Sequence, residues 1–258
     1  MLNFHREGSG EPLVLAHALG ASWELWRPVL PALAERRDVI AVDLPGFGGS
    51  PEGVEASVPA FADAVEATLD ELGVGEVDVV GNSMGGWVAI EMARRGRARA
   101  AVAISPAGMG RSVENWVARV WLAVMRGMAG PTAPAAPWLA QRAWGRGLLA
   151  SGMFARPGGL EPDYLMGLAQ AYAAAPGFDA TRRWLFGHRA EGLGEIEVPV
   201  LIAWGSRDLL LPLRQGYRFA AAIPRSELRV LEGLGHSPMG DDPEFVADVI
   251  LEFAERER

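Results

Sequence analysis

The sequence predicts an α/β fold, in which helices cover both faces of a mainly parallel, twisted β-sheet and a helical segment is inserted between two strands. Three observations support this prediction. Short apolar runs, typical of buried strands, alternate with amphipathic helical segments over residues 13–104. The strand pattern is absent from residues 108–189 and returns at residue 199. A Gly-x-Ser-x-Gly motif lies between a predicted strand and a predicted helix.

The first part of the chain supplies parallel strands joined by helices. The first helix is predicted over residues 23–35, with Ser22 as its N-cap. The second begins at Ser57, has Pro59 in its first turn and ends at Gly73. A third helix follows the Gly-x-Ser-x-Gly motif. The strands are the apolar runs at residues 13–16, 39–42, 77–80 and 100–104.

The last part of the chain returns to the same alternation. The last helix has Asp241 and Glu244 at its start, a spacing typical of a capping box. Strands are predicted at residues 199–204 and 228–231, and helices at residues 213–222 and 243–255.

Between these two parts, residues 108–189 are predicted to form a helical cap. Proline residues are expected to divide it into short helices. Five of the nine tryptophans lie in it, and we expect most of them to pack the cap against the core. Trp121, Trp144 and Trp184 are the candidates for substrate contact. The domain prediction is therefore a core of residues 1–107 and 190–258, with the cap at residues 108–189. The dividing prolines are Pro131, Pro134, Pro137, Pro157, Pro162 and Pro176.

Composition excludes several kinds of chemistry. The chain has 258 residues, half of them hydrophobic, which suffices for one large domain with an inserted subdomain. Its net charge of −8 argues against a nucleic-acid partner. All 24 basic residues are arginine, so Schiff-base chemistry on lysine is excluded. The absence of cysteine excludes disulfides, thiolate catalysis and Cys-ligated metals.

No targeting segment is recognisable in the sequence. Residues 1–8 contain no apolar run typical of a signal peptide. No stretch has the roughly 18 uninterrupted apolar residues that a membrane span needs. We therefore expect a cytoplasmic protein without a membrane span.

The most informative motif is the sequence GNSMGG at residues 81–86. In a nucleophile elbow, a serine on a sharp strand-to-helix turn holds its hydroxyl out at the sheet edge. Its neighbours two residues away must be small, because the helix passes close to the strand. The start of the helix also directs free N–H groups at an anion beside the serine. The motif alone is also compatible with an ordinary glycine-rich turn, so its context decides between the two.

Three side chains suited to nucleophilic catalysis follow predicted strands. They are Ser83, Asp208 and His236, in the chain order expected for an elbow serine. Serine needs a base to take its proton, and imidazole can do so near neutral pH. A carboxylate on the other ring nitrogen fixes the tautomer. His236 could instead be a surface residue, and Asp208 could cap the next helix.

Other groups near these strand ends were considered as the catalytic acid, as oxyanion donors or as a second base. Glu232, Asp241 and Asp242 are weaker candidates for the acid. The oxyanion hole needs two N–H donors, for which we expect the backbone of Met84 and of Leu19. Next to Leu19, His17 fits a structural loop residue better than a second base.

Five sequence pieces in order resemble the α/β-hydrolase superfamily from about Leu13 to the C-terminus. One difference is Ala18, where many members have glycine after the histidine, and its methyl group could narrow the oxyanion loop. The resemblance implies the α/β-hydrolase fold with a variable cap. The pieces are HALG at residues 17–20, DLPGFGGS at 43–50, GNSMGG at 81–86, GSRD at 205–208 and GHSP at 235–238.

The nucleophile narrows the activities that this resemblance implies. Members that dehalogenate or open epoxides have an aspartate where this chain has Ser83, and hydroxynitrile lyases of this fold rely on a lysine. The expected activity is hydrolysis of a small apolar ester or lactone through an acyl-enzyme, with no metal or organic cofactor. Arg111, Arg119 and Arg126 could bind a substrate carboxylate, but a solvated helix face suits their spacing better.

Three alternatives stay open at this point. Carbon–carbon-bond hydrolases of the meta-cleavage type have a similar elbow, but usually carry a glycine-rich oxyanion loop and an aromatic residue where this chain has Ser237. A cofactor-free perhydrolase or haloperoxidase would use the same triad. Some members of the fold bind a ligand without turnover, and the fold does not decide this point.

Overall fold

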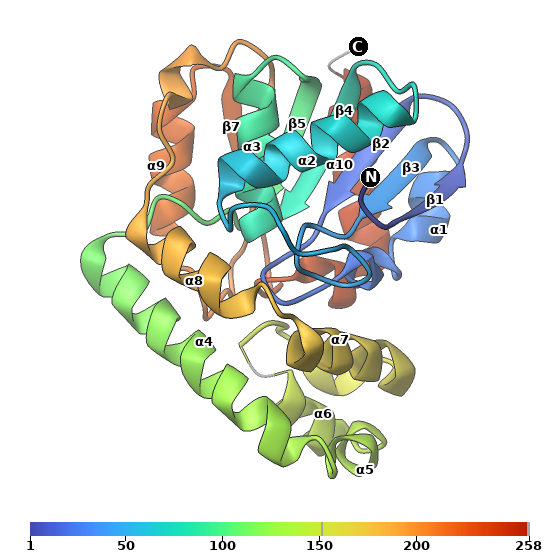
Figure 1. The fold of residues 1–258 in the computed structure, drawn as a ribbon, viewed down its shortest axis with the longest axis vertical. Coiled ribbons are helices and arrows are strands. Elements are labelled where there is room, and N and C mark those ends of the chain that lie inside the picture. The colour runs from blue at the N-terminus through green and yellow to red at the C-terminus, as the bar shows by residue number, and fades with distance from the viewer. Residues whose placement is uncertain (151, 257–258) are drawn as a thin grey trace.

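The computed structural model describes residues 1–150 and 152–256, and a seven-stranded sheet forms its centre (Figure 1). The strand order is β1-β3-β2-β4-β5-β6-β7. Every neighbouring pair is parallel except β1 and β3. This arrangement confirms the predicted α/β class. The strands are β1 (Phe4–Gly8), β2 (Pro12–Ala16), β3 (Asp38–Val42), β4 (Val77–Asn82), β5 (Ala98–Ile104), β6 (Val200–Gly205) and β7 (Ser226–Leu231).

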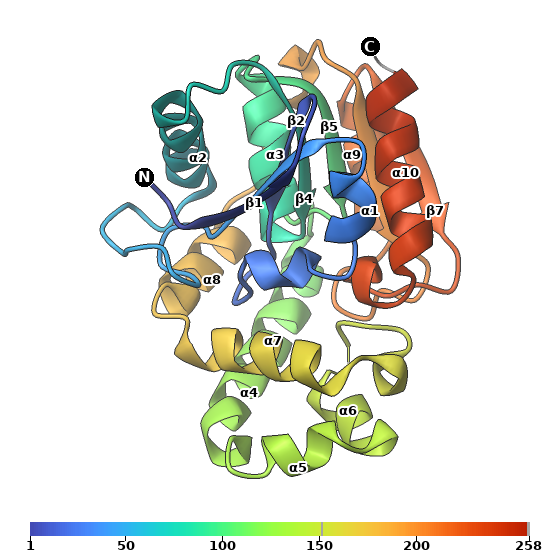
Figure 2. The same ribbon diagram turned by 90° about the vertical axis from the view of Figure 1, so that its right-hand side faces the viewer.

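Helices cover both faces of the sheet because the central strands are apolar on both sides (Figure 2). One core cluster joins the sheet to α2 (Val58–Glu71), α3 (Met84–Arg94) and α9 (Arg214–Ala222). The other joins it to a 3-10 helix at Trp23–Trp26, to α1 (Leu30–Ala34) and to α10 (Pro243–Arg256). The two clusters hold the sheet rigidly, so its edges can position functional side chains.

The predicted cap segment contains five α-helices and no strand among its described residues. These helices lie below the sheet in both views (Figures 1 and 2), and α4 and α8 pack against the core through Leu122, Phe178 and Leu185. Ala190 N donates to Gly108 O at 3.0 Å, so the two ends of the segment lie side by side. The helices are α4 (Ser112–Thr132), α5 (Ala136–Ala140), α6 (Ala143–Leu149), α7 (Pro162–Ala174) and α8 (Phe178–Gly187).

Helix α4 is held to the core by one buried carboxylate. Glu114 forms ion pairs with Arg218, at 2.7 Å, and with Arg214. It also accepts the Arg111 N–H at 2.8 Å, which caps the start of α4. The hydrogen bonds from Arg218 are the main reason why the pKa of Glu114 is lowered to about 2. The base of the cap is therefore fixed to α9 by charge-assisted bonds.

Several local predictions are wrong, and each has a physical reason. Strand β1 was not predicted, because its residues are mostly polar and it lies at the sheet edge. The helix predicted over residues 23–35 is a 3-10 helix followed by the short α1, since Pro28 and Pro31 lack the N–H that a continuous helix needs. Ser22 makes no capping hydrogen bond, and the Trp23 N–H binds Asp43 instead.

Two further predictions fail at helix ends. Helix α4 continues through Pro131 to its last residue, Thr132, so this proline does not divide it. The capping box at α10 does not form around Asp241. Asp242 accepts the Phe245 N–H at 3.2 Å, and Asp241 binds the N–H groups of other segments. Finally, no helix among the described residues is sufficiently long and apolar to cross a membrane.

Candidate active site

Ser83 lies at the turn between β4 and α3 with a backbone conformation that is rare for serine. Its φ is 57° and its ψ is −111°. A Cβ added at Gly81 would lie 1.9 Å from Gly85 O, and one at Gly85 would lie 2.1 Å from Ala16 O. Neither backbone oxygen can move aside, so both glycines of the motif are required. The local geometry is that of a nucleophile elbow.

His236 and Asp208 meet at the carboxyl ends of β7 and β6. Asp208 Oδ2 lies 2.7 Å from His236 Nδ1. The other carboxylate oxygen accepts the N–H groups of Leu210 and Leu211, at 2.9 and 2.8 Å. Asp208 therefore does not cap α9, which begins at Arg214 with no side-chain cap; it holds the turn before that helix and orients the imidazole. With Nδ1 bound to a carboxylate, the ring can keep a lone pair on Nε2.

His236 Nε2 is buried and has no hydrogen-bond partner among the described residues. Ser83 and His236 line the same cavity. An unpaired imidazole nitrogen inside a cavity is costly unless a ligand or a reacting group uses it. His236 Nε2 is thus an unused acceptor in the cavity that Ser83 also lines.

Of the two expected oxyanion donors, Met84 follows the serine directly and Leu19 lines the same cavity. Met84 is the first residue of α3, and the first hydrogen bond of that turn runs from Trp87 N to Ser83 O at 3.1 Å. The Met84 N–H thus precedes the intrahelical bonds. Leu19 lines the cavity, and its N–H makes no hydrogen bond within the described part of the chain. Both N–H groups therefore stay candidates for the oxyanion hole.

His17 has the structural role that its position in the loop indicated. Its Nδ1 lies 2.8 Å from Ala18 O, and its Nε2 accepts the Leu44 N–H at 2.9 Å. Complete burial lowers the pKa of this imidazole. A neutral ring with both nitrogens in use cannot serve as a second base, and instead joins the loops that follow β2 and β3.

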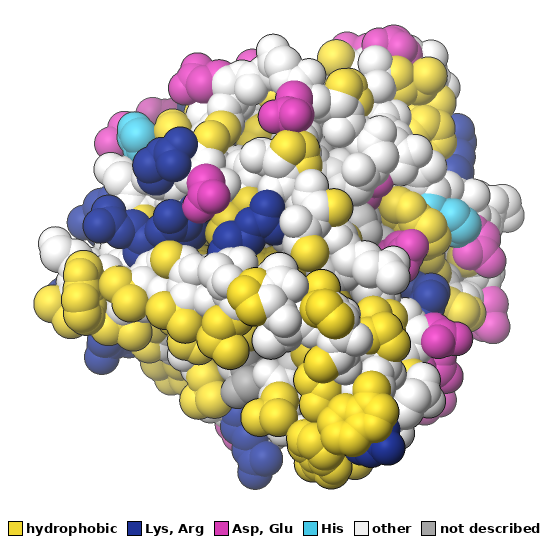
Figure 3. Space-filling model, turned by 60° about the horizontal axis from the view of Figure 1, so that its bottom comes forward, with side chains coloured by type: hydrophobic (Ala, Val, Ile, Leu, Met, Phe, Trp, Pro, Cys, Tyr) yellow, Lys and Arg dark blue, Asp and Glu magenta, His cyan; other side chains and the backbone are white. Residues whose placement is uncertain are grey.

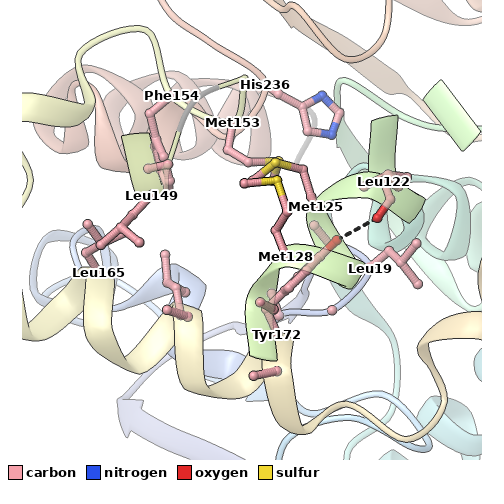
Figure 4. Close-up of a pocket in the computed structure, with 18 of the residues that line it drawn as sticks. Leu19, Leu122, Met125, Met128, Leu149, Met153, Phe154, Leu165, Tyr172 and His236 are labelled. Carbon is pink, nitrogen blue, oxygen red and sulfur yellow. Dashed lines mark hydrogen bonds between the residues drawn. The ribbon is translucent and has the colours of Figure 1, made fainter. Parts of the chain in front are cut away.

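A cavity of about 570 Å³ lies between the sheet edge and the cap. Its described lining is almost entirely apolar and includes no arginine, aspartate or glutamate. Figure 4 shows Met125, Met128 and Met153 between His236 and the side chains of Leu149 and Leu165. The volume lies within the range of small-molecule sites, and flexible methionines can adapt to different ligand shapes.

The structure brings one of the three candidate tryptophans to this cavity. Trp121 lines it, whereas Trp144 and Trp184 do not. Trp144 is exposed and packs edge-on against Trp138, and Trp184 stacks against His188. The expectation that Trp144 and Trp184 contact substrate is therefore corrected. Periodicity could not separate these cases, because it shows which residues share a helix face but not what that face meets.

The three arginines considered at the start of the cap lie outside the cavity lining. Arg126 donates to the carbonyl oxygens of Tyr172 and Ala175, so it joins two cap helices. Arg111 and Arg119 are exposed and line a separate cleft. None of the three lines the cavity that holds Ser83 and His236, so none is placed to bind a substrate carboxylate there.

Comparison with known proteins agrees with this geometry. The model of the alpha/beta hydrolase family matches residues 13–249. This chain belongs to the α/β-hydrolase family.

Relatives of this α/β-hydrolase differ in what they cleave. A 2-hydroxy-6-oxo-2,4-heptadienoate hydrolase of Pseudomonas putida is 29% identical over 91% of this chain and 85% of its own length. An epoxide hydrolase of Mycobacterium tuberculosis is 35% identical over 77% of this chain and 95% of its own length. A solved esterase from Thermogutta terrifontis superposes with a TM-score of 0.77, at 25% identity over 99% of this chain and 93% of that one.

One residue of the hydrolase site was missed by the sequence analysis. Asn82, the residue before Ser83, donates to Ile104 O at 3.1 Å and to His236 O at 2.9 Å. It also accepts the Ser237 hydroxyl at 2.9 Å. Asn82 therefore ties the elbow to the histidine loop, and Ser237 completes the connection. The sequence did contain an indication of this role, because Asn82 is a polar residue at the end of a buried strand. A buried polar side chain needs hydrogen-bond partners.

We expect Asn82→Ala to loosen the histidine loop of this hydrolase. The change removes the bond to His236 O and leaves the Ser237 hydroxyl buried without its partner, which costs about 1–3 kcal/mol of unfolding free energy. The value of kcat should fall about tenfold to a hundredfold, because small displacements of the base are costly. Thermal unfolding and steady-state kinetics measure the two effects.

Asn82→Asp provides the comparison, because it keeps the oxygen that accepts from Ser237 but loses the donor to His236 O. It should lower kcat as Asn82→Ala does. A positioning role for Asn82 would be contradicted by variants that lose stability but keep the kcat of the wild type.

Proposed function

We propose that this α/β-hydrolase cleaves uncharged carboxylic esters or lactones through an acyl-enzyme on Ser83. The observation that carries the proposal is an apolar cavity that contains Ser83 and the unpartnered His236 Nε2 and has no charged side chain in its described lining. The elbow, the His236–Asp208 bond and the free N–H groups of Leu19 and Met84 support it.

In the proposed reaction, Ser83 Oγ attacks the carbonyl carbon while His236 Nε2 takes the hydroxyl proton. The N–H groups of Leu19 and Met84 stabilise the oxyanion. His236 then protonates the leaving alcohol, which departs as the carbonyl re-forms. A water molecule, deprotonated by His236, attacks the acyl-enzyme and releases the carboxylic acid with Ser83 restored.

The lining of the cavity favours uncharged substrates. A carboxylate that entered it would lose its hydration without meeting a cation, which costs several kcal/mol. The Pseudomonas relative is named for a heptadienoate, which carries a carboxylate. An ester or lactone with an apolar acyl group loses no such hydration. This argument supports ester hydrolysis over carbon–carbon bond hydrolysis for this chain.

Hydrolysis of p-nitrophenyl esters of increasing acyl length tests the proposal. Each buried methylene contributes about 0.8 kcal/mol, so kcat/KM should rise about threefold to fourfold per methylene until the cavity is filled. We therefore expect octanoate to be cleaved on the order of a hundredfold faster than butyrate at low concentration. The rate should stop rising at the acyl length that fills the cavity.

Substrates of other classes define the contrary outcomes. Turnover of 2-hydroxy-6-oxo-2,4-heptadienoate at a higher kcat/KM than any ester would contradict the ester assignment. Tight binding of esters without release of p-nitrophenol would favour a ligand-binding role instead.

A further inference from the structure

The outer side of the cap carries a long exposed apolar stripe. Its members are 41–73% exposed and recur along α4 at intervals of one, three or four residues, so they share one side of the helix. We call this set the α4 stripe: Val113, Trp116, Val117, Val120, Val124 and Met128. Trp116 also lines a shallow cleft with residues 186–189.

A second exposed apolar group lies on the short helices that follow. Trp138 and Trp144 stack edge to face at 5.6 Å, and Leu148 is exposed near them in the sequence. We call these three residues the tryptophan cluster. Met128 of the α4 stripe and Leu148 of the tryptophan cluster both line the catalytic cavity. Each apolar group therefore includes a residue that is both exposed and part of the cavity wall.

The charges beside these groups have one sign. Residues 111–160 contain six arginines and a single acidic residue, Glu114, which is buried under Arg214 and Arg218. None of these six arginines forms an ion pair within the described part of the chain. Figure 3 shows hydrophobic side chains gathered along the cap with arginine side chains beside them. The six are Arg111, Arg119, Arg126, Arg142, Arg146 and Arg156.

The rest of the protein has the opposite charge. Residues 108–189 carry nine arginines and four acidic residues, whereas the remaining chain carries 15 arginines and 28 acidic residues. A negatively charged surface would therefore attract the cap and repel the core. Such a field orients the molecule before contact is made.

We propose that the α4 stripe and the tryptophan cluster dock onto an anionic lipid surface. A basic amphipathic helix with exposed tryptophan lies in the plane of such a surface, with its apolar side among the acyl chains. Arginines near the headgroups add electrostatic attraction to an anionic surface. A second copy of this chain fits less well, because two caps face to face would bring unpaired arginines together. A row of exposed apolar side chains of this kind is typical of an interaction site.

Docking in this orientation would place the cavity wall formed by Met128 and Leu148 against the lipid. An uncharged ester dissolved in the lipid could then enter the cavity without crossing water. The docking itself does not depend on hydrolysis, so it can be tested with the Ser83→Ala protein whether or not the proposed reaction occurs.

Sedimentation with vesicles tests the docking. Ser83→Ala protein is mixed with vesicles of phosphatidylglycerol and phosphatidylcholine in equal parts, or with vesicles of phosphatidylcholine alone. We expect binding to the anionic vesicles to be at least tenfold stronger and to weaken at high salt. Trp116→Glu, added to this protein, should lower binding at least tenfold. Tyr217→Glu is the matched control, because Tyr217 on α9 is 58% exposed and Trp116 is 60% exposed.

Arg119→Gln separates charge from apolar contact. It should remove part of the preference for anionic vesicles while leaving binding to phosphatidylcholine unchanged. Equal binding to both vesicle types, or equal losses from Trp116→Glu and Tyr217→Glu, would overturn the proposal. A third contrary outcome is a dimer in sedimentation velocity that Trp116→Glu dissociates, together with no binding of the wild type to vesicles. The exposed apolar face would then bind a second copy of this chain.

Discussion

Replacing Ser83 by alanine should lower kcat for p-nitrophenyl esters by about 10⁴-fold or more. The hydroxyl is the only group at the elbow that can form the acyl-enzyme, and neither the oxyanion donors nor His236 can take over its role. Binding of the substrate depends on the apolar cavity, so KM should change much less than kcat. Mass spectrometry adds a direct measurement, because a fluorophosphonate should label the wild type once and the variant not at all.

The elbow should survive this change. Its backbone is held by Ser83 N to Ile104 O at 2.9 Å, and by the N–H groups of Trp87 and Ala107 on Ser83 O. None of these bonds uses the hydroxyl, so the melting temperature should change little.

Ser105→Ala is the matched control for this experiment. Ser105 is also buried with a positive φ, at 45°, and its hydroxyl has no partner among the described residues. It follows the neighbouring strand β5 but is absent from the cavity lining. The control should keep kcat within a few-fold of the wild type. Equal activity of both variants would show that the esterase reaction does not pass through Ser83.

The second large effect is expected at Asp208. Asp208→Asn should lower kcat by about 10³-fold to 10⁴-fold with little loss of stability. The amide oxygen can keep the N–H groups of Leu210 and Leu211, which hold the side chain in place. The amide nitrogen then faces His236 Nδ1 and donates to it. The imidazole proton must move to Nε2, where the lone pair is needed for the serine proton.

Steady-state kinetics and thermal unfolding of the Asn variant measure these effects. Asp242→Asn is its control, because Asp242 also accepts a backbone N–H but lies at the start of α10. Retention of more than a tenth of kcat by Asp208→Asn would contradict the role of Asp208 as the acid that orients His236.

Local sequence patterns predicted a feature correctly where that feature depends only on residues close together in the chain. The elbow could be predicted because Gly81 and Gly85 must be small to let α3 pass β4, and both lie within two residues of Ser83. The placement of Asp208 and His236 after strands could be predicted because parallel strands end at one edge of a sheet. The division of residues 23–35 was missed although Pro28 and Pro31 were visible, because the apolar pattern continued across them.

Contacts between residues far apart in the chain could not be predicted from the sequence. Asn82 and Ser237 are 155 residues apart, and only the fold shows that their side chains join the elbow to the histidine loop. Asp241 was expected to cap a helix. Its oxygens instead accept the N–H groups of Gly235, Ala155 and Arg156, and so join the inserted helical segment to the histidine loop. A polar side chain can serve any donor within reach, and the folded chain decides which donor that is.

The sequence by itself determined the fold class, the family resemblance and the order of Ser83, Asp208 and His236, because each follows from spacing along the chain. Only the tertiary structure decided what surrounds them. It placed Trp121 in the cavity but Trp144 and Trp184 outside it, and kept the described lining free of charged side chains. Helix periodicity distinguishes one side of a helix from the other, but an apolar side can face the core, a substrate or solvent. The packing of the cap against the sheet edge made that choice.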